Sequence, residues 1–256
     1  MTNARRVLVH ADKRALAGSV AARFITKVVD LLDQQPRVNI ALTGGSVGSA
    51  VLEAINESPA RDSIDWSRVI LWWSDERWLP RNDAERNDTQ ARIALLDHVA
   101  LRAENIHWCA ASDSGMNLDE AATAYAVELA AAAHDGRATP RFDILFLGVG
   151  PDGHVASLFP DSPGIRVTEG TVIAVRNSPK PPPERLSLTL PVINSADRIW
   201  LTLSGPDKAS ALGLALADAS TWEVPVAGIK GRLRTVFFVD REAAAEVSED
   251  LIATEY

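Results

Sequence analysis

Short apolar runs recur along this chain, between stretches that repeat apolar residues at helical spacing. Most runs are continuously apolar rather than alternating, which is typical of strands buried on both faces of a parallel sheet. We expect strands at Val7–Val9, Val38–Leu42, Val69–Trp73, Phe142–Leu147, Thr171–Val175, Leu186–Leu190, Ile199–Leu203 and Val236–Val239. The alternation of strand and helix patterns predicts an α/β fold.

The intervening stretches predict helices. Leu16, Val20, Phe24 and Val28 repeat at helical spacing behind Asp12, which can act as an N-cap. Further helices are expected after Ser46 and over Thr89–Leu96, Leu118–Ala133, Asp207–Leu216 and Arg241–Ile252. The prediction is a mostly parallel, twisted sheet flanked by helices, open and doubly wound in the Rossmann-like manner.

No internal repeat or low-complexity linker divides the 256 residues, so we expect one α/β domain over residues 1–256. Residues 75–135 carry helical patterns without an evident strand and are expected as a small helical lobe. Pro179–Pro183 reads PKPPP and predicts a stiff loop. The connection from about 160 to 185 is a candidate lid.

The formal charge of −8 argues against a broad nucleic-acid-binding face, although a local basic pocket can still bind an anion. Cys109 is the single cysteine; we expect it to be a buried thiol in a protein of the reducing cytoplasm. The N-terminal stretch carries no signal-peptide pattern, and no apolar run is long enough to predict a membrane span.

Four loops after expected strands carry unusual residues, and ligands of open α/β sheets bind at the carboxyl ends of strands. The first loop holds Thr43, Gly44, Gly45 and Ser46. Its glycines permit close approach of a ligand to the backbone, and Ser46 can cap the following helix. Free N–H groups at a helix start bind anions, so the loop is either a phosphate site or a plain capped turn.

The second loop places Asp75, Glu76 and Arg77 directly after a buried strand. Arg77 can bind a phosphate bidentately or stabilise an oxyanion, whereas the two carboxylates can equally form a surface ion pair. In another such loop, Lys208 is expected in the first turn of a helix, where the helix dipole disfavours a cation unless an anion lies nearby. Lys208 is therefore a candidate anion ligand, with a solvated lysine as the alternative.

The remaining loop lies in Phe142–Pro160, FDILFLGVGPDGHVASLFP, whose glycines match the dinucleotide-binding pattern G-x-G-x-x-G. A dinucleotide site needs a long helix next, and Pro160 leaves room for barely two turns. The next strand ends in Arg176 rather than an acidic residue, which keeps an NADP-dependent oxidoreductase only as an alternative.

The same turn presents His154, which can titrate near neutrality, and Asp152, which is close enough in sequence to orient it. The other histidines, His10, His98, His107 and His134, lie in unremarkable contexts. No His/Cys cluster has metal-ligand spacing, and no G-x-S-x-G elbow is present, so neither a metal nor a serine nucleophile is expected.

Taken in order, these motifs resemble the 6-phosphogluconolactonases, which share a superfamily with the glucosamine-6-phosphate deaminases/isomerases. The matching segments are ALTGGS (41–46), SDERWLPRNDAERN (74–87), LGVGPDGHVASLFP (147–160), PPPERLSLTLPVINSA (181–196) and LSGPDKASAL (203–212). The likeness spans residues from about 5 to 240. Leu158–Pro160 stands where deaminases carry an acidic residue, and Arg77 stands where they carry an aromatic one, so the lactonase branch is favoured.

The resemblance implies hydrolysis of 6-phospho-D-glucono-1,5-lactone to 6-phospho-D-gluconate in the oxidative branch of the pentose phosphate pathway, without cofactor. It implies a small phosphosugar lactone as partner, and a monomer or small homo-oligomer. The alternatives are a glucosamine-6-phosphate deaminase or phosphosugar isomerase, and a non-catalytic sugar-phosphate-binding regulator.

On this interpretation, His154 activates water and returns the proton to the ring oxygen, Asp152 orients it, and Arg77 or the N–H groups of the glycine turn meet the oxyanion. The phosphate is expected on the first loop, with charge from Arg77 and Lys208. The full expected substrate-binding set is Thr43, Gly44, Gly45, Ser46, Asp75, Glu76, Arg77, Gly150, Gly153, Arg185 and Lys208.

Overall fold

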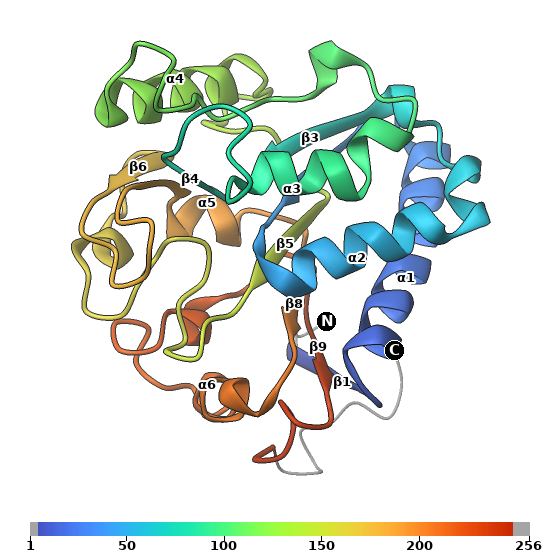
Figure 1. The fold of residues 1–256 in the computed structure, drawn as a ribbon, viewed down its shortest axis with the longest axis vertical. Coiled ribbons are helices and arrows are strands. Elements are labelled where there is room, and N and C mark those ends of the chain that lie inside the picture. Colours follow the sequence, from blue (N-terminus) through green and yellow to red (C-terminus); the bar gives the residue numbers. More distant parts are fainter. Residues whose placement is uncertain (1–4, 248–256) are drawn as a thin grey trace.

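The computed structural model describes residues 5–247 and is built around a six-stranded parallel sheet (Figure 1). Its strands, in spatial order, are β1 (Arg5–His10), β9 (Arg234–Asp240), β8 (Arg198–Leu203), β5 (Ile144–Gly148), β2 (Val38–Leu42) and β3 (Val69–Trp73). All neighbouring strands run parallel, which confirms the predicted fold class. The strand order reverses between β2 and β5, and such a switch point is where open α/β sheets bind ligands.

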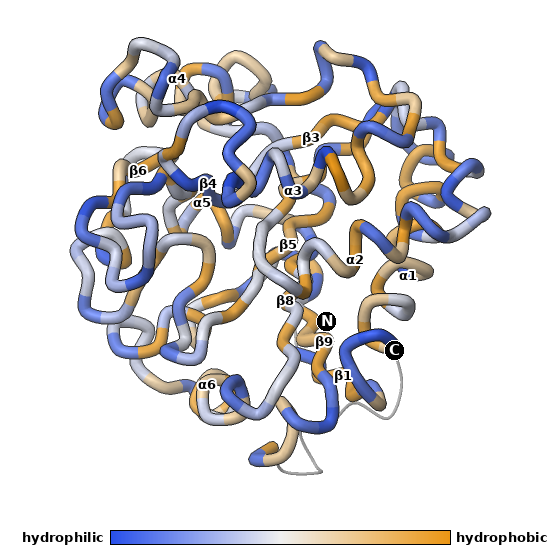
Figure 2. The backbone as a smooth tube through the Cα atoms, in the orientation of Figure 1, coloured by the Kyte–Doolittle hydropathy of each residue, from blue (hydrophilic) through white to orange (hydrophobic). Residues whose placement is uncertain are grey.

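The α-helices lie around the strands of the molecule (Figure 1). They are α1 (Lys13–Gln34), α2 (Gly45–Glu57), α3 (Asn87–Ala94), α4 (Leu118–Ala131), α5 (Leu190–Asn194) and α6 (Ala209–Leu216). The expected cap of α1 is confirmed, because Asp12 Oδ1 accepts a hydrogen bond of 2.8 Å from the Ala15 N–H. In Figure 2 the apolar colour follows the central strands, and β5 and β9 are almost wholly buried. Within residues 5–247, no helix is both long and apolar enough to cross a membrane.

A second, three-stranded antiparallel sheet corrects the sequence interpretation. It contains β4 (Asp75–Arg77), β7 (Arg185–Leu188) and β6 (Val172–Val175) in that spatial order. The strands expected near 171–175 and 186–190 exist, but they lie outside the parallel sheet. After β3 the chain turns away at Ser74, whose carbonyl accepts a hydrogen bond of 2.9 Å from the Leu188 N–H.

The expectation of a strand-free stretch over residues 75–135 is wrong, because β4 lies in it and pairs with β7. Helix α4, in the same stretch, contacts β6 and β7 of the antiparallel sheet. The expected C-terminal helix Arg241–Ile252 is also wrong over its described part, where residues 241–247 form turns; residues 248–252 lie outside the described residues.

Candidate active site

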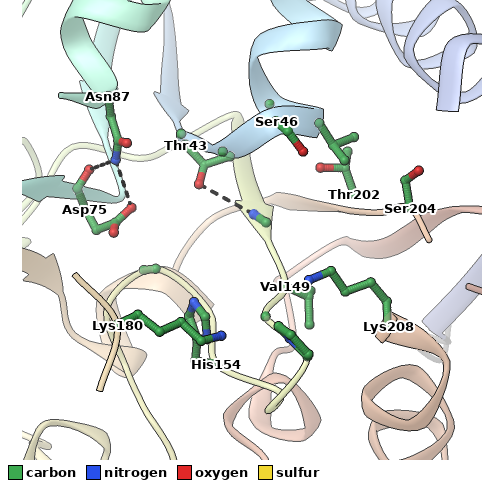
Figure 3. A pocket seen from close by; sticks show the side chains of 18 of the residues that line it. Thr43, Ser46, Asp75, Asn87, Val149, His154, Lys180, Thr202, Ser204 and Lys208 are labelled. Carbon is green, nitrogen blue, oxygen red and sulfur yellow. Dashed lines mark hydrogen bonds between the residues drawn. The ribbon is translucent and has the colours of Figure 1, made fainter. Parts of the chain in front are cut away.

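A cavity of about 220 Å³ opens at the carboxyl edge of the parallel sheet, where the loops after β2, β5 and β8 meet the antiparallel sheet (Figure 3). Its lining comprises residues 43–48, Asp75, Arg77, Asn87, residues 148–151, His154, Ala156, Lys180, Arg185, Thr202, Ser204 and Lys208. The cavity lies at the switch point, so the fold brings the four predicted loops together. Three residues of the expected set, Glu76, Asp152 and Gly153, do not line it.

Asp152 instead lies outside the cavity lining and contacts the Nδ1 side of His154. Its Oδ1 lies 2.5 Å from Nδ1 of the imidazole. Burial alone raises the pKa of Asp152, but the hydrogen bonds from His154 and Lys180 outweigh it and bring the pKa below its usual value. The carboxylate is therefore an anion that accepts the Nδ1 proton, which leaves Nε2 of His154 as the nitrogen able to take a proton.

The glycines of the turn fit around this histidine. A Cβ on Gly150 would lie 2.0 Å from Nδ1 of His154, so only glycine allows the ring to lie against the backbone here. Gly153 has φ +81°, and a Cβ on it would lie 2.7 Å from Cγ1 of Val224. Val155 forms β-bridges with Val149 and Leu158, and no helix follows the glycines as a dinucleotide site requires.

On the opposite wall, the chain turns from β2 into α2. The N-cap is Gly44 rather than Ser46, which corrects the expectation: Ser46 already lies inside the first turn of the helix. A Cβ on Gly44 would lie 1.8 Å from Oδ1 of Asn87, so this position requires glycine for close packing. The first N–H groups of α2 have no helical acceptor, and a helix start of this kind is suited to binding an anion, so the phosphate site expected here stays a prediction.

Lys208 completes this wall. Pro206–Lys208 forms a 3-10 turn before α6, so Lys208 lies just ahead of the α-helix rather than in its first turn as expected. Its Nζ lies 3.0 Å from Oδ2 of Asp207, and its side chain lines the cavity. The nearby Ser204 hydroxyl donates to Asp240 Oδ2 at 2.5 Å, which fixes the loop that carries Lys208.

The charged triplet of β4 divides between two sides of the strand, because successive side chains of a strand alternate. Asp75 and Arg77 line the cavity, whereas Glu76 is buried on the other side. Glu76 Oε1 accepts hydrogen bonds of 2.7 Å from the N–H groups of Arg77 and Asn87. Glu76 therefore joins β4 to the start of α3 and is separated from the cavity.

Burial and, to a lesser extent, the nearby Asp88 carboxylate together raise the pKa of Glu76 to about 8, against the opposing effects of Arg86 and two backbone N–H groups. Arg86 is itself almost fully buried, and its Nη2 lies 2.8 Å from Oδ2 of Asp88. This charged cluster holds the strand that carries Arg77. Arg77 in turn donates from Nη1 to the Glu85 carbonyl, while its buried Nε has no partner in the described structure.

Arg185 lines the cavity, but most of its guanidinium is already engaged. Its Nε donates to the Pro182 carbonyl at 3.1 Å, and Nη2 donates to the carbonyls of Pro181 at 2.9 Å and Lys180 at 3.1 Å. Burial lowers the pKa of Arg185. Arg185 thus holds residues 178–183, hereafter the proline loop, through three of the loop's backbone carbonyls.

Sequence reasoning assigned no role to four cavity residues with polar side chains: Asn87, Lys180, Thr202 and Ser204. Lys180 is the most consequential, because its Nζ lies 3.1 Å from Asp152 Oδ1 and 3.3 Å from His154 Nδ1. The sequence feature that could have indicated Lys180 is its position in a stiff loop that follows an expected strand. The prolines of that loop predicted its stiffness but not where the lysine side chain lies.

The remaining predictions concern residues away from the cavity. Cys109 is buried as expected, and burial raises its pKa well above the usual value. His107 stacks on Trp72 at 3.7 Å, and none of the other bystander histidines lines the cavity. In the described part of the chain, no group of three or more His, Cys, Asp or Glu is arranged to hold a metal ion. A metal-free reaction stays a prediction.

Comparisons with known proteins agree with this geometry. A family profile described as "Glucosamine-6-phosphate isomerases/6-phosphogluconolactonase" matches residues 11–237. The chain is 51% identical to a 6-phosphogluconolactonase of Streptomyces coelicolor, over 98% of both chains, and 44% identical to one of Mycobacterium tuberculosis, over 94% of both. The solved 6-phosphogluconolactonase of Trypanosoma brucei superposes with a TM-score of 0.82 at 25% identity, covering 96% of this chain and 100% of that one. The chain therefore belongs to the glucosamine-6-phosphate isomerase/6-phosphogluconolactonase family, and the named relatives are from its lactonase branch.

Proposed function

We propose that this protein hydrolyses 6-phospho-D-glucono-1,5-lactone to 6-phospho-D-gluconate in the oxidative branch of the pentose phosphate pathway. One observation carries the proposal: a single cavity joins the Asp152–His154 pair to the helix start at Gly44–Ser46 and to Lys208. The substrate has a matching polarity, with an electrophilic carbonyl on the ring and a phosphate dianion at the far end. Membership of the lactonase branch supports the same assignment.

In the proposed reaction, the oxygen of a water molecule bonds to the lactone carbonyl carbon while Nε2 of His154 takes a proton from that water. The carbonyl π electrons move to oxygen and form an alkoxide. When the alkoxide collapses, the bond to the ring oxygen breaks, and that oxygen takes the proton from the imidazolium. Asp152 holds Nδ1–H throughout, which keeps Nε2 directed at the water and stabilises the transient imidazolium.

The N–H groups of the glycine turn and Arg77 are the proposed partners of the alkoxide or phosphate, and Asp75 and Thr43 shape the space between the two ends. Asp75 is held by the Ser157 hydroxyl, which donates to its Oδ2 at 2.8 Å. Arg77 is the one guanidinium of this cavity in the described structure that is not committed to the proline loop.

Lys208 and the α2 start are assigned to the phosphate. Lys208→Ala is expected to raise KM for the phosphorylated lactone by about tenfold or more, because a charge-assisted contact to phosphate is lost. Turnover of unphosphorylated glucono-1,5-lactone is expected to change little. An equal effect on both lactones would remove Lys208 from the phosphate site.

The function itself is tested by following loss of the phosphorylated lactone and subtracting its spontaneous hydrolysis. Acceleration by the wild-type protein supports the proposal. Ammonia release from glucosamine 6-phosphate would indicate the deaminase alternative instead. Binding of 6-phosphogluconate without acceleration would indicate the regulator, and spectroscopic binding of NADP would indicate the oxidoreductase.

The proposal includes a cytoplasmic location, which is supported by the single buried thiol and the absence of any internal disulfide. It also includes a small phosphosugar lactone as the partner, with no nucleic acid. A monomer or small homo-oligomer is the expected assembly, and light scattering of the purified protein measures it.

A further inference from the structure

Lys180 is a charged residue of the cavity that the reaction scheme leaves without a task. It extends from the proline loop to the catalytic pair, and Figure 3 shows it beside His154. Its side chain is 37% exposed. Its Nζ donates to Asp152 Oδ1, but the neighbouring Nδ1 of His154 carries the proton that Asp152 accepts, so Nδ1 is no acceptor for Lys180. An ammonium has three donors, and in the described structure Asp152 takes one of them.

The proline loop that carries Lys180 is fixed on both sides. Ser178 Oγ donates to the Lys180 carbonyl at 2.8 Å and accepts from the Lys180 N–H at 3.3 Å. Arg185 binds the carbonyls of Lys180, Pro181 and Pro182 from the β7 side. Three consecutive prolines restrict φ in the rest of the loop. A buried guanidinium and a hydroxyl thus hold the half-buried Lys180 beside the catalytic pair.

We propose that Lys180 is a catalytic residue whose ammonium donates a hydrogen bond to the alkoxide that forms when water attacks the lactone carbonyl, and that Ser178 and Arg185 are its positioning residues. This inference rests on the proposed lactone hydrolysis. The alkoxide forms beside Nε2 of His154, and the flexible four-carbon stem of lysine lets Nζ shift from the Asp152 side of the ring to that oxygen. The negative charge exists only after attack, so the contact favours the transition state over bound substrate.

Lys180→Met keeps the length of the side chain and removes its charge. We expect kcat to fall on the order of 10²-fold with KM for the phosphorylated lactone little changed, which is the effect of removing one oxyanion donor. Unphosphorylated glucono-1,5-lactone should show the same fall. Lys180→Arg, which keeps a cation, should retain more activity than Lys180→Met. Lys27→Met, which removes a half-buried lysine of α1, is the matched control and should behave as wild type.

Unchanged kcat in Lys180→Met, or a KM increase confined to the phosphorylated lactone, overturns the assignment. Equal losses in the Arg and Met variants overturn the role of charge. Ser178→Ala should lower kcat in the wild-type background and add nothing in the Lys180→Met background; an additive loss overturns the positioning role. All these effects are measured relative to wild type, so failure of the wild-type protein to accelerate lactone loss is a separate result that counts against the proposed function itself.

Discussion

At the scale of single residues, the proposed catalytic pair depends on a backbone that leaves room for the imidazole. Asp152 and His154 are two positions apart, and the turn between Gly150 and Gly153 folds the ring back over its own chain. The Gly150 N–H donates to the His154 carbonyl at 2.9 Å, which closes this turn. The glycines that match a dinucleotide pattern by letter therefore serve the histidine.

Gly150→Ala tests this packing. Its new Cβ would lie 2.0 Å from His154 Nδ1, so the ring must move away from Asp152. We expect kcat to fall on the order of 10²-fold, since a misplaced base loses most of its contribution. Gly18→Ala in α1 is the control, because a Cβ there meets nothing within 4 Å. It should keep full activity and gain about 0.5–1 kcal/mol of stability. Normal turnover by Gly150→Ala would contradict the account.

The sequence predicted this pair because its contact is local. Lys180 makes the equivalent approach to Asp152 from 28 residues away, and nothing in a single sequence reports such a distance. Arg185 was expected in the substrate-binding set without a defined role. The carbonyls that engage its guanidinium come from the fold of the proline loop, which its prolines did not specify.

At the scale of elements, β4 determines which charged residues reach the cavity. A three-residue strand of Asp75, Glu76 and Arg77 has no apolar alternation, so the sequence indicated a loop. Strand geometry then sends Glu76 away from its two neighbours, and burial beside Arg86 and Asp88 accounts for its raised pKa. By contrast, the strands of the central sheet were predictable, since continuous apolar runs between turn residues are typical of strands buried on both faces of a parallel sheet.

The raised pKa of Glu76 predicts a pH dependence of stability. Between about pH 4.5 and pH 8, the folded state holds a proton on Glu76 that the unfolded chain has released. The stabilisation from protonated Glu76 is thus fully present below the pKa of the unfolded chain, about 4.5, and is lost as pH rises through the folded-state pKa of about 8. The loss amounts to about a few kcal/mol in the free energy of unfolding. Denaturant unfolding across this range should show stability falling with pH more steeply in wild type than in Glu76→Gln. Identical slopes would mean that Glu76 is ionised throughout.

At the scale of the whole molecule, the site exists only because the strand order reverses between β2 and β5. This topology places the helix start at Gly44, the turn at Gly150 and the loop at Lys208 around one cavity. The sequence predicted that these loops follow strands, and the general rule for open sheets predicted that they meet. It did not predict the antiparallel sheet, in which β4 pairs with β7 from about a hundred residues further along the chain.

A ligand that spans both ends of the cavity should stabilise the folded protein. At a concentration 100 times its Kd, 6-phospho-D-gluconate is expected to add about 2.7 kcal/mol to the free energy of unfolding. Lys208→Ala should need a higher concentration for the same shift in Tm. If gluconate without phosphate stabilised the protein equally well, the phosphate end of the site would be wrongly assigned.

The central claim is that His154 activates the water that opens the lactone. The direct test is kcat of His154→Ala with 6-phospho-D-glucono-1,5-lactone, with spontaneous hydrolysis subtracted from every trace. The account predicts a loss of at least about 10²-fold in kcat with KM little changed, because a general base contributes to the transition state and not to binding. A near-normal kcat would contradict the account and remove His154 from the mechanism.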